Sequence, residues 1–249
     1  MYFRDRLASA EAMNGTFVKS TEPHSIEILA HAGFDFVLID SEHAPFDRRA
    51  LDTALLATRA ARIAGVVRVR DDSKAEILNA LDLGAEGIVV PHVRSAAQAR
   101  HVVDAARHSG YRGYSNSPRA GAYGTIGMWT HVDAADRLVA VIAMIEDVDA
   151  VEHIEEILDV DGLDAVMLGR NDLAVSMQDR EPGARRVERL TERVLSAANE
   201  AGKQVLLFVS DGADARQYRE RGVMSAVISS DQGLLRRAAV VEIQQASEQ

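Results

Sequence analysis

Two acidic residues, Glu146 and Asp172, each follow a short apolar run and are separated by about one strand–helix repeat. If the fold brings them together, their negative charges repel, and a proton or a cation must compensate. Carboxylate oxygens are hard ligands of the kind that Mg²⁺ or Mn²⁺ prefers. The pair is therefore a candidate metal site. The alternative is that each carboxylate only caps the helix that follows it.

His43 follows the apolar run FVLID and is the only histidine that we expect at the end of a strand. An imidazole in that position can act as a base near neutral pH if a carboxylate orients it. Asp40 is the nearby candidate for that carboxylate, and Asp82, which precedes another apolar run, is a remote one. The alternative is a turn histidine that hydrogen-bonds to the backbone.

Arg68 lies within the apolar run GVVRVR, where a buried guanidinium needs an anionic partner. Strand alternation predicts that Arg68 and Arg70 point the same way. An inward-facing Arg68 could stabilise negative charge on a substrate oxygen. The alternative is a salt bridge to a carboxylate inside the fold.

Eight short apolar runs could place these groups, and most are followed by a longer segment with apolar residues at i, i+3, i+4 and i+7. This alternation predicts a parallel sheet covered by helices, either a single-domain (β/α)₈ TIM barrel over residues 1–249 or a doubly wound open sheet. In a barrel, His43, Arg68, Glu146 and Asp172 would share the rim at the C-terminal strand ends. The expected strands are residues 16–20, 34–40, 65–70, 87–91, 138–146, 163–169, 203–210 and 225–230.

Two further segments are distinctive. Residues 111–128 form a long connection rich in Gly, Ser and Asn, which is typical of a functional or interface loop. The segment DQGLLRRAAVVEIQQAS at 231–247 predicts a helix that packs on the barrel or docks onto another subunit.

Composition excludes several classes of function. The 249 residues carry a formal net charge of −10 and no cysteine, which argues against nucleic-acid binding, disulfides and thiol catalysis. No stretch approaches the roughly 20 apolar residues of a membrane helix, and there is no signal-peptide pattern. We expect a cytoplasmic protein without a membrane or nucleic-acid partner. Neither a Walker A motif nor a Rossmann glycine motif after a strand is present.

The sequence resembles the HpcH/HpaI aldolases, metal-dependent class II pyruvate aldolases such as 4-hydroxy-2-oxoheptanedioate and 2-dehydro-3-deoxyglucarate aldolase. The similarity runs from about Gly15 to Ala239 in constant order. It implies a (β/α)₈ barrel, a homo-oligomer (hexamer or trimer) and a C-terminal helix exchanged between subunits. The segments that carry it are IDSEHAPFD, ALDLGAEGIVVPHV, MIED, LGRNDLAVSM and SSDQGLLRRAA.

The resemblance also implies roles for individual residues. Mg²⁺ or Mn²⁺, or else Co²⁺, would act as cofactor in cleaving a 4-hydroxy-2-oxo acid to pyruvate, or a similar 2-oxo acid, and an aldehyde. The implied positions are His43 as catalytic base, Asp82 as the acid that raises its basicity, Arg68 as enolate stabiliser and substrate ligand, Glu146 and Asp172 as metal ligands, and Gly169, Asn171 and Asp172 around the substrate carboxylate.

Two positions depart from the family pattern. Met144 stands where several members have a substrate-binding glutamine, and Arg170 where a small residue or proline is common. Two other functions stay open at this point. One is a lyase of the citrate lyase β or malyl-CoA type, and the other is a non-catalytic barrel subunit.

Overall fold

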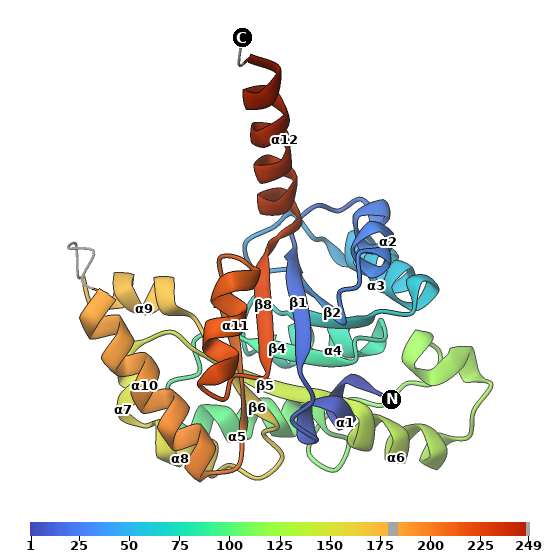
Figure 1. Ribbon diagram of the computed structural model, residues 1–249. Helices are drawn as coiled ribbons and strands as arrows, with labels where there is room; N and C mark the ends of the chain where they lie inside the picture. Colours follow the sequence, from blue (N-terminus) through green and yellow to red (C-terminus); the bar gives the residue numbers. More distant parts are fainter. Residues whose placement is uncertain (179–183, 248–249) are drawn as a thin grey trace.

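The structure, a computed structural model that describes residues 1–178 and 184–247, is a closed barrel of eight parallel strands in chain order. The predicted barrel is therefore confirmed, and the doubly wound sheet is excluded (Figure 1). The strands are β1 (Met13–Val18), β2 (Phe36–Asp40), β3 (Ala64–Arg68), β4 (Gly87–Val90), β5 (Ala140–Ile145), β6 (Ala165–Leu168), β7 (Gln204–Val209) and β8 (Ser225–Ser230).

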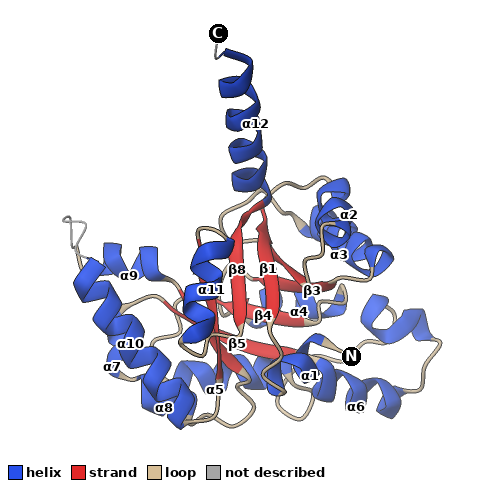
Figure 2. Ribbon diagram, viewed as in Figure 1, coloured by secondary structure: helices blue, strands red, loops and turns tan. Residues whose placement is uncertain are grey.

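Helices surround this barrel on its outer side (Figure 2). Several begin at a residue whose side chain accepts a backbone N–H, as Asp47 does from Ala50 and Ser73 from Glu76. The helices are α1 (Phe3–Ala8), α2 (Pro23–His31), α3 (Arg48–Ala61), α4 (Lys74–Asp82), α5 (Ala96–Ala106), η1 (Arg119–Gly124), α6 (Met128–Leu138), α7 (Val148–Glu152), α8 (Ile154–Leu158), α9 (Arg170–Ser176), α10 (Ala184–Glu200), α11 (Gly212–Glu220) and α12 (Asp231–Ser247).

Strand alternation divides the core into two layers. One set of side chains, such as Val37, Ile39 and Val67, packs between the strands and the helices. The other set, such as Phe36 and Leu38, fills the barrel interior. Helix α1 closes the barrel at the N-terminal ends of the strands, where the ring of Phe3 lies 5.1 Å from that of Phe36. The barrel is thus packed at one end and open only at the other.

The first strand begins and ends earlier than its sequence predicts. Met13 to Gly15 already pair with β8, so the strand starts before residue 16. It stops at Val18 because the N–H groups of Lys19 and Ser20 each donate to the carboxylate of Asp231, at 3.0 Å, instead of to a neighbouring strand. This contact joins the end of β1 to the start of α12.

Helix α12 projects away from the end of the barrel at which β8 terminates (Figure 1). None of its residues 231–247 is buried. Across the described residues, no helix combines the length and apolar character needed to cross a membrane.

Candidate active site

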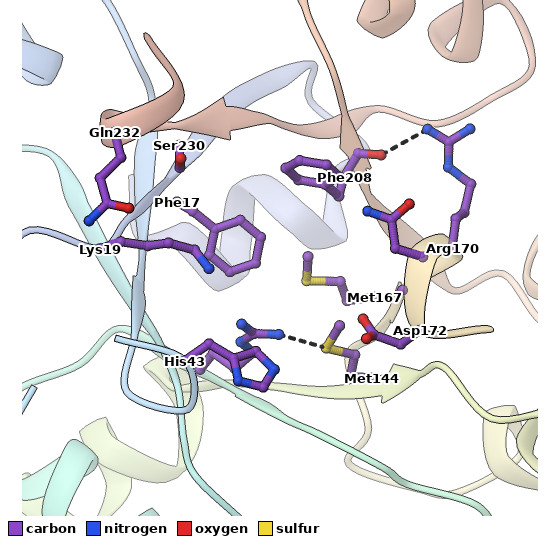
Figure 3. Close-up of a pocket in the computed structure, with 13 residues that line it drawn as sticks. Phe17, Lys19, His43, Met144, Met167, Arg170, Asp172, Phe208, Ser230 and Gln232 are labelled. Atoms are coloured by element: carbon purple, nitrogen blue, oxygen red, sulfur yellow. Dashed lines mark hydrogen bonds between the residues drawn. The ribbon is translucent and has the colours of Figure 1, made fainter. Parts of the chain in front are cut away.

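A cavity of about 450 Å³ opens at the C-terminal ends of the strands. Phe17, Met144, Met167 and Phe208 provide an apolar surface within it. Polar side chains from the C-terminal ends of strands and from the loops and helices that follow them surround this surface (Figure 3). They are Lys19, His43, Arg68, Arg170, Asn171, Asp172, Ser230 and Gln232.

Arg68 is buried at the end of β3 and is held by the fully buried Asp40 at the end of the neighbouring strand β2. Its Nε and Nη2 donate to the two oxygens of that carboxylate, at 3.0 and 2.8 Å. Its Nη1 lies 3.1 Å from Oε2 of Glu42. The predicted salt bridge to a barrel carboxylate is therefore present, and Arg68 still lines the cavity.

Asp40 stays ionised despite its burial. Burial raises the pKa of this carboxyl, but the hydrogen bonds and charge of Arg68 outweigh it, with help from Lys19 and the His43 N–H. The resulting pKa is about 2, below the ordinary value of 3.8. The Asp40–Arg68 pair is thus a fixed charged wall of the cavity.

His43 lies at the rim of the cavity, three residues after the end of β2. Its backbone N–H donates to Oδ1 of Asp40 at 3.1 Å, whereas its ring Nε2 lies 3.8 Å from Oε2 of Glu42. The side chain is 58% exposed, so the ring is accessible to a ligand in the cavity. Asp40 therefore orients the backbone of His43, and Glu42 is the carboxylate nearer to its ring.

Glu146 follows β5 and is buried beside Gly169, which follows the neighbouring strand β6. A Cβ at residue 169 would lie 2.9 Å from Cβ of Glu146 and 3.1 Å from its Oε2. Glycine at this position therefore leaves the space that the carboxylate occupies. The Glu146 side chain accepts the His92 N–H at 2.8 Å and does not cap α7, whose N-cap residue is Asp147.

Asp172 lies in the first turn of α9 and lines the cavity. The pKa of Glu146 is raised, first by burial and further by the charges of Glu42 and Asp172, although His92 acts in the opposite direction. The structure thus brings the two predicted metal ligands near enough to repel each other.

The residues around Glu146 and Asp172 fit a divalent cation. Both offer carboxylate oxygens, and a bound positive ion would offset the burial and the neighbouring negative charges of Glu42 and Asp172 that raise the pKa of Glu146. Across residues 1–178 and 184–247, no three side chains of His, Cys, Asp or Glu are grouped to hold a metal. A cation here would therefore need water or substrate oxygens to complete its coordination.

Sequence reasoning overlooked His92, which follows β4 and adopts a left-handed backbone conformation with φ of 53°. Its Nδ1 lies 2.9 Å from Asp147 and 3.4 Å from Glu146. Burial lowers the pKa of this ring, but the surrounding carboxylates outweigh it and raise the pKa above the ordinary 6.5. Its place directly after the run GIVVP could have identified it, so His43 is not the only histidine at a strand end.

Asp82 is not brought to His43 within this chain. It is the last residue of α4, which leads back to the N-terminal ends of the strands, and it pairs with the buried Arg112 at 3.5 Å. Its role as the acid that assists His43 stays a prediction. The connection at 111–128, which includes Arg112 and η1, lies at this same end of the barrel.

Arg70 and Arg170 also differ from expectation. Strand β3 ends at Arg68, so Arg70 does not share its inward face and instead donates to the Phe46 carbonyl. Arg170 lines the cavity, but its guanidinium donates hydrogen bonds to the Tyr218 hydroxyl and, at 3.1 Å, to the Phe208 carbonyl. Met144, where the resemblance had implied a glutamine, directs its sulfur toward Nη1 of Arg68 at 3.9 Å (Figure 3).

Comparison with known proteins gives a consistent result. Residues 14–238 match the family model described as HpcH/HpaI aldolase/citrate lyase. The chain is 33% identical over 240 residues to hydroxypyruvate/pyruvate aldolase of Pseudomonas aeruginosa, covering 95% of this chain and 89% of that protein. It is 31% identical over 239 residues to 5-keto-4-deoxy-D-glucarate aldolase of Klebsiella pneumoniae, covering 95% and 93%.

A solved structure shares the whole fold. The crystal structure of an HpcH/HpaI aldolase/citrate lyase family protein from Burkholderia cenocepacia superposes with a TM-score of 0.92 at 34% identity. The superposition covers 98% of each chain.

Proposed function

Because this chain belongs to the HpcH/HpaI aldolase/citrate lyase family, we propose that it is a divalent-metal-dependent aldolase acting on a 4-hydroxy-2-oxo acid. The reaction is reversible cleavage to pyruvate, or a similar 2-oxo acid, and an aldehyde. Relatives named as pyruvate or 4-hydroxy-2-oxo-heptane-1,7-dioate aldolases support the substrate class.

One observation carries this proposal. A base candidate (His43), a buried cation (Arg68) and a carboxylate (Asp172) line the same cavity, with Glu146 packed behind Gly169 at its edge. An aldol cleavage needs such groups, because it removes a hydroxyl proton while negative charge develops on an oxygen of the other fragment. Surface charges that served only solubility would not converge on one cavity.

The roles of the protein groups follow from this placement. The exposed ring of His43 accepts the proton of the C4 hydroxyl as the C3–C4 bond breaks. The bonding electrons move into the 2-oxo fragment, and Arg68 stabilises the negative charge that develops on its C2 oxygen. The carbonyl of the aldehyde forms at C4, C3 then takes up a proton from solvent to give the 2-oxo acid, and the exposed His43 ring returns its proton to solvent. Asp40 keeps Arg68 in place during these steps.

We expect the metal ion to bind at the side of the cavity where the carboxylates lie. Glu146 and Asp172 would hold Mg²⁺, Mn²⁺ or Co²⁺, and the bound cation would act as a Lewis acid on the 2-oxo group. The backbone at Gly169 and Asn171 would meet the carboxylate of the 2-oxo acid, since both residues line this part of the cavity.

We also propose that the chain works as a homo-oligomer, a hexamer or a trimer, with α12 docked on another subunit. Four apolar side chains on α12 are exposed, and exposed apolar side chains on a projecting helix are typical of an interface. They are Leu235, Val240, Val241 and Ile243.

The test is a coupled assay of pyruvate release from a panel of 4-hydroxy-2-oxo acids, with and without EDTA. We expect cleavage of at least one member, loss of activity on chelation and recovery with Mg²⁺ or Mn²⁺. Cleavage of malyl-CoA without cleavage of any hydroxy-oxo acid would overturn the proposal in favour of an acyl-CoA lyase. Full activity in EDTA would remove the metal from it.

A further inference from the structure

We propose that Lys19, assisted by Gln232, binds a carboxylate at the far end of the substrate, so that the enzyme prefers 4-hydroxy-2-oxo acids with a second acid group. This inference rests on the proposed aldolase function and deepens it by assigning the aldehyde half of the substrate. The roles assigned above concern only the 2-oxo half and the bond that breaks.

The position of Lys19 suits this role. Figure 3 shows Lys19 and Gln232 together on one side of the cavity, and Asp172 on the other. A substrate whose 2-oxo acid end is held near Asp172 would therefore extend past His43 and Arg68 toward Lys19. The apolar rings of Phe17 and Phe208, whose centroids are 5.9 Å apart, line the space between and suit the methylene carbons of such a chain.

The backbone beneath Lys19 is fixed rather than loose. The Lys19 N–H donates to Oδ1 of Asp231 at 3.0 Å, and the Gln232 N–H donates to the same oxygen at 2.8 Å. One carboxylate thus positions both residues. A preorganised pair of this kind loses little freedom when it binds a ligand.

The two arginines of the cavity already pair with protein groups. Arg68 directs Nε and Nη2 to Asp40, and its Nη1 faces Glu42. Arg170 directs its nitrogens to the Tyr218 hydroxyl and the Phe208 carbonyl. Neither guanidinium offers a new carboxylate the paired N–H groups that this contact needs.

The ammonium group of Lys19 has hydrogen-bond donors that are not used within the described part of the protein. Its Nζ lies 2.9 Å from Oδ2 of Asp40, and no other carboxylate of the described residues is within 4.0 Å. An ammonium group has three N–H donors, so two remain for a ligand. The Lys19 side chain is 28% exposed, on the cavity side, and Gln232 adds an amide donor at the mouth. This combination matches a carboxylate better than a neutral group.

The experiment compares two probes of equal length, 4-hydroxy-2-oxoheptanedioate and 4-hydroxy-2-oxoheptanoate, in which a methyl group replaces the distal carboxylate. The readout is the ratio of their kcat/KM values, measured for wild type, Lys19→Met, Lys19→Arg and the control Lys74→Met. Lys74 serves as the control because it packs over Tyr111, away from the cavity. A charged hydrogen bond predicts that Lys19→Met lowers the ratio about tenfold or more. Lys19→Arg should retain most of the preference, and Lys74→Met all of it.

The ratio separates recognition from a structural role. If Lys19 acts only by supporting Asp40, both substrates slow equally in Lys19→Met, the ratio stays at the wild-type value and the inference is overturned. A wild-type enzyme that cleaves both probes with equal kcat/KM overturns it as well, while leaving the aldolase function intact. A wild-type enzyme that cleaves neither these probes nor any other hydroxy-oxo acid instead contradicts the proposed function itself.

Discussion

At the residue scale, the Asp40–Arg68 pair links the stability of the barrel to the chemistry of its cavity. Burying a carboxylate and a guanidinium costs desolvation free energy, which is offset only when the two groups are well hydrogen-bonded to each other. Here Nε and Nη2 of Arg68 donate to both oxygens of Asp40. The positive charge therefore sits at the cavity wall before any substrate arrives.

Asp40→Asn tests this pair through pH. The folded-state pKa of Asp40 is about 2 and the ordinary value is 3.8, so the unfolded chain binds the proton more readily between these values. The contribution of Asp40, about 2 kcal/mol, is fully present above roughly pH 4 and is lost as the pH falls toward 2. We expect Asp40→Asn to lower the free energy of unfolding by about 3 kcal/mol at pH 7, because it leaves Arg68 without its partner.

Urea denaturation at pH 7, 4 and 3 measures this effect. The gap between wild type and Asp40→Asn should narrow as the pH falls, whereas Asp159→Asn, at an exposed site after α8, should change stability by no more than about 0.5 kcal/mol. A gap that is constant with pH would show that the charge of Asp40 does not stabilise the fold.

Glu146→Ala tests the metal site in the absence of any substrate. Mg²⁺ or Mn²⁺ should raise the Tm of the wild type by several degrees, since a ligand at a hundredfold excess over its Kd stabilises by about 2.7 kcal/mol. Glu146→Ala should abolish the shift, and Glu156→Ala, an exposed glutamate of α8, should preserve it. An equal shift in wild type and Glu146→Ala would exclude Glu146 as a ligand.

His43→Ala separates the base from the metal. Loss of a general base should lower kcat about a hundredfold or more. The metal-induced rise in Tm should remain, because His43 is not among the proposed ligands. His24→Ala, on the exposed face of α2, serves as the control for an unspecific effect of losing a histidine. Turnover of His43→Ala at the wild-type rate would remove His43 from the mechanism.

At this scale, the sequence predicts site residues only where position along a strand decides the outcome. Arg68, Glu146 and Asp172 converge because they lie at or shortly after the C-terminal ends of β3, β5 and β6 in one barrel. Asp82 could not be placed in this way, because it ends a helix and its surroundings depend on packing at the far end of the barrel. His92 was overlooked although it directly follows the run GIVVP. Its left-handed backbone and its contacts with Glu146 and Asp147, in contrast, leave no mark in the apolar pattern.

At the element scale, the eight apolar runs predicted a parallel sheet covered by helices, because strands such as β2, β4 and β6 are buried on both faces and lack polar alternation. The pairing of β1 with β8, which closes the barrel and excludes the doubly wound sheet, is a long-range contact that the runs alone do not determine. The ends of β1 were not predictable. They depend on pairing with β8 and on Asp231, which is more than two hundred residues away in sequence.

Gly15→Ala tests how tightly β1 is packed against β2. A Cβ at residue 15 would lie 2.3 Å from ring atoms of Phe36, and that ring is itself held against Phe3. Overpacking of this kind should lower the free energy of unfolding by about 2 kcal/mol. The matched control is Gly212→Ala at the start of α11, where the added methyl meets open space.

Chemical denaturation of both glycine variants gives the comparison. Gly212→Ala should be neutral or slightly stabilising, since alanine favours a helix by up to about 1 kcal/mol over glycine. If Gly15→Ala were as stable as Gly212→Ala, the barrel interior near Phe36 would have to be looser than these contacts indicate.

At the scale of the whole molecule, the projecting helix and the cavity are parts of one structure. Asp231 begins α12, and its carboxylate holds the backbone of Lys19 and Ser20 beside the cavity. A contact that fixes α12 on another subunit would therefore also fix one wall of the site. This connection gives a physical reason for an oligomer in a barrel whose cavity lies within a single chain.

The double variant Leu235→Glu/Ile243→Glu tests the role of α12 in assembly. These side chains are 72% and 69% exposed in the single chain, so charging them should leave the barrel folded but prevent α12 from burying its apolar side chains against another subunit. We expect the wild type to sediment as a hexamer or trimer and the double variant as a monomer, with unchanged far-UV circular dichroism. Ile28→Glu, at an isoleucine of α2 that is 66% exposed, controls for charge placed elsewhere on the surface. An unchanged sedimentation coefficient in the double variant would exclude α12 as the assembly surface.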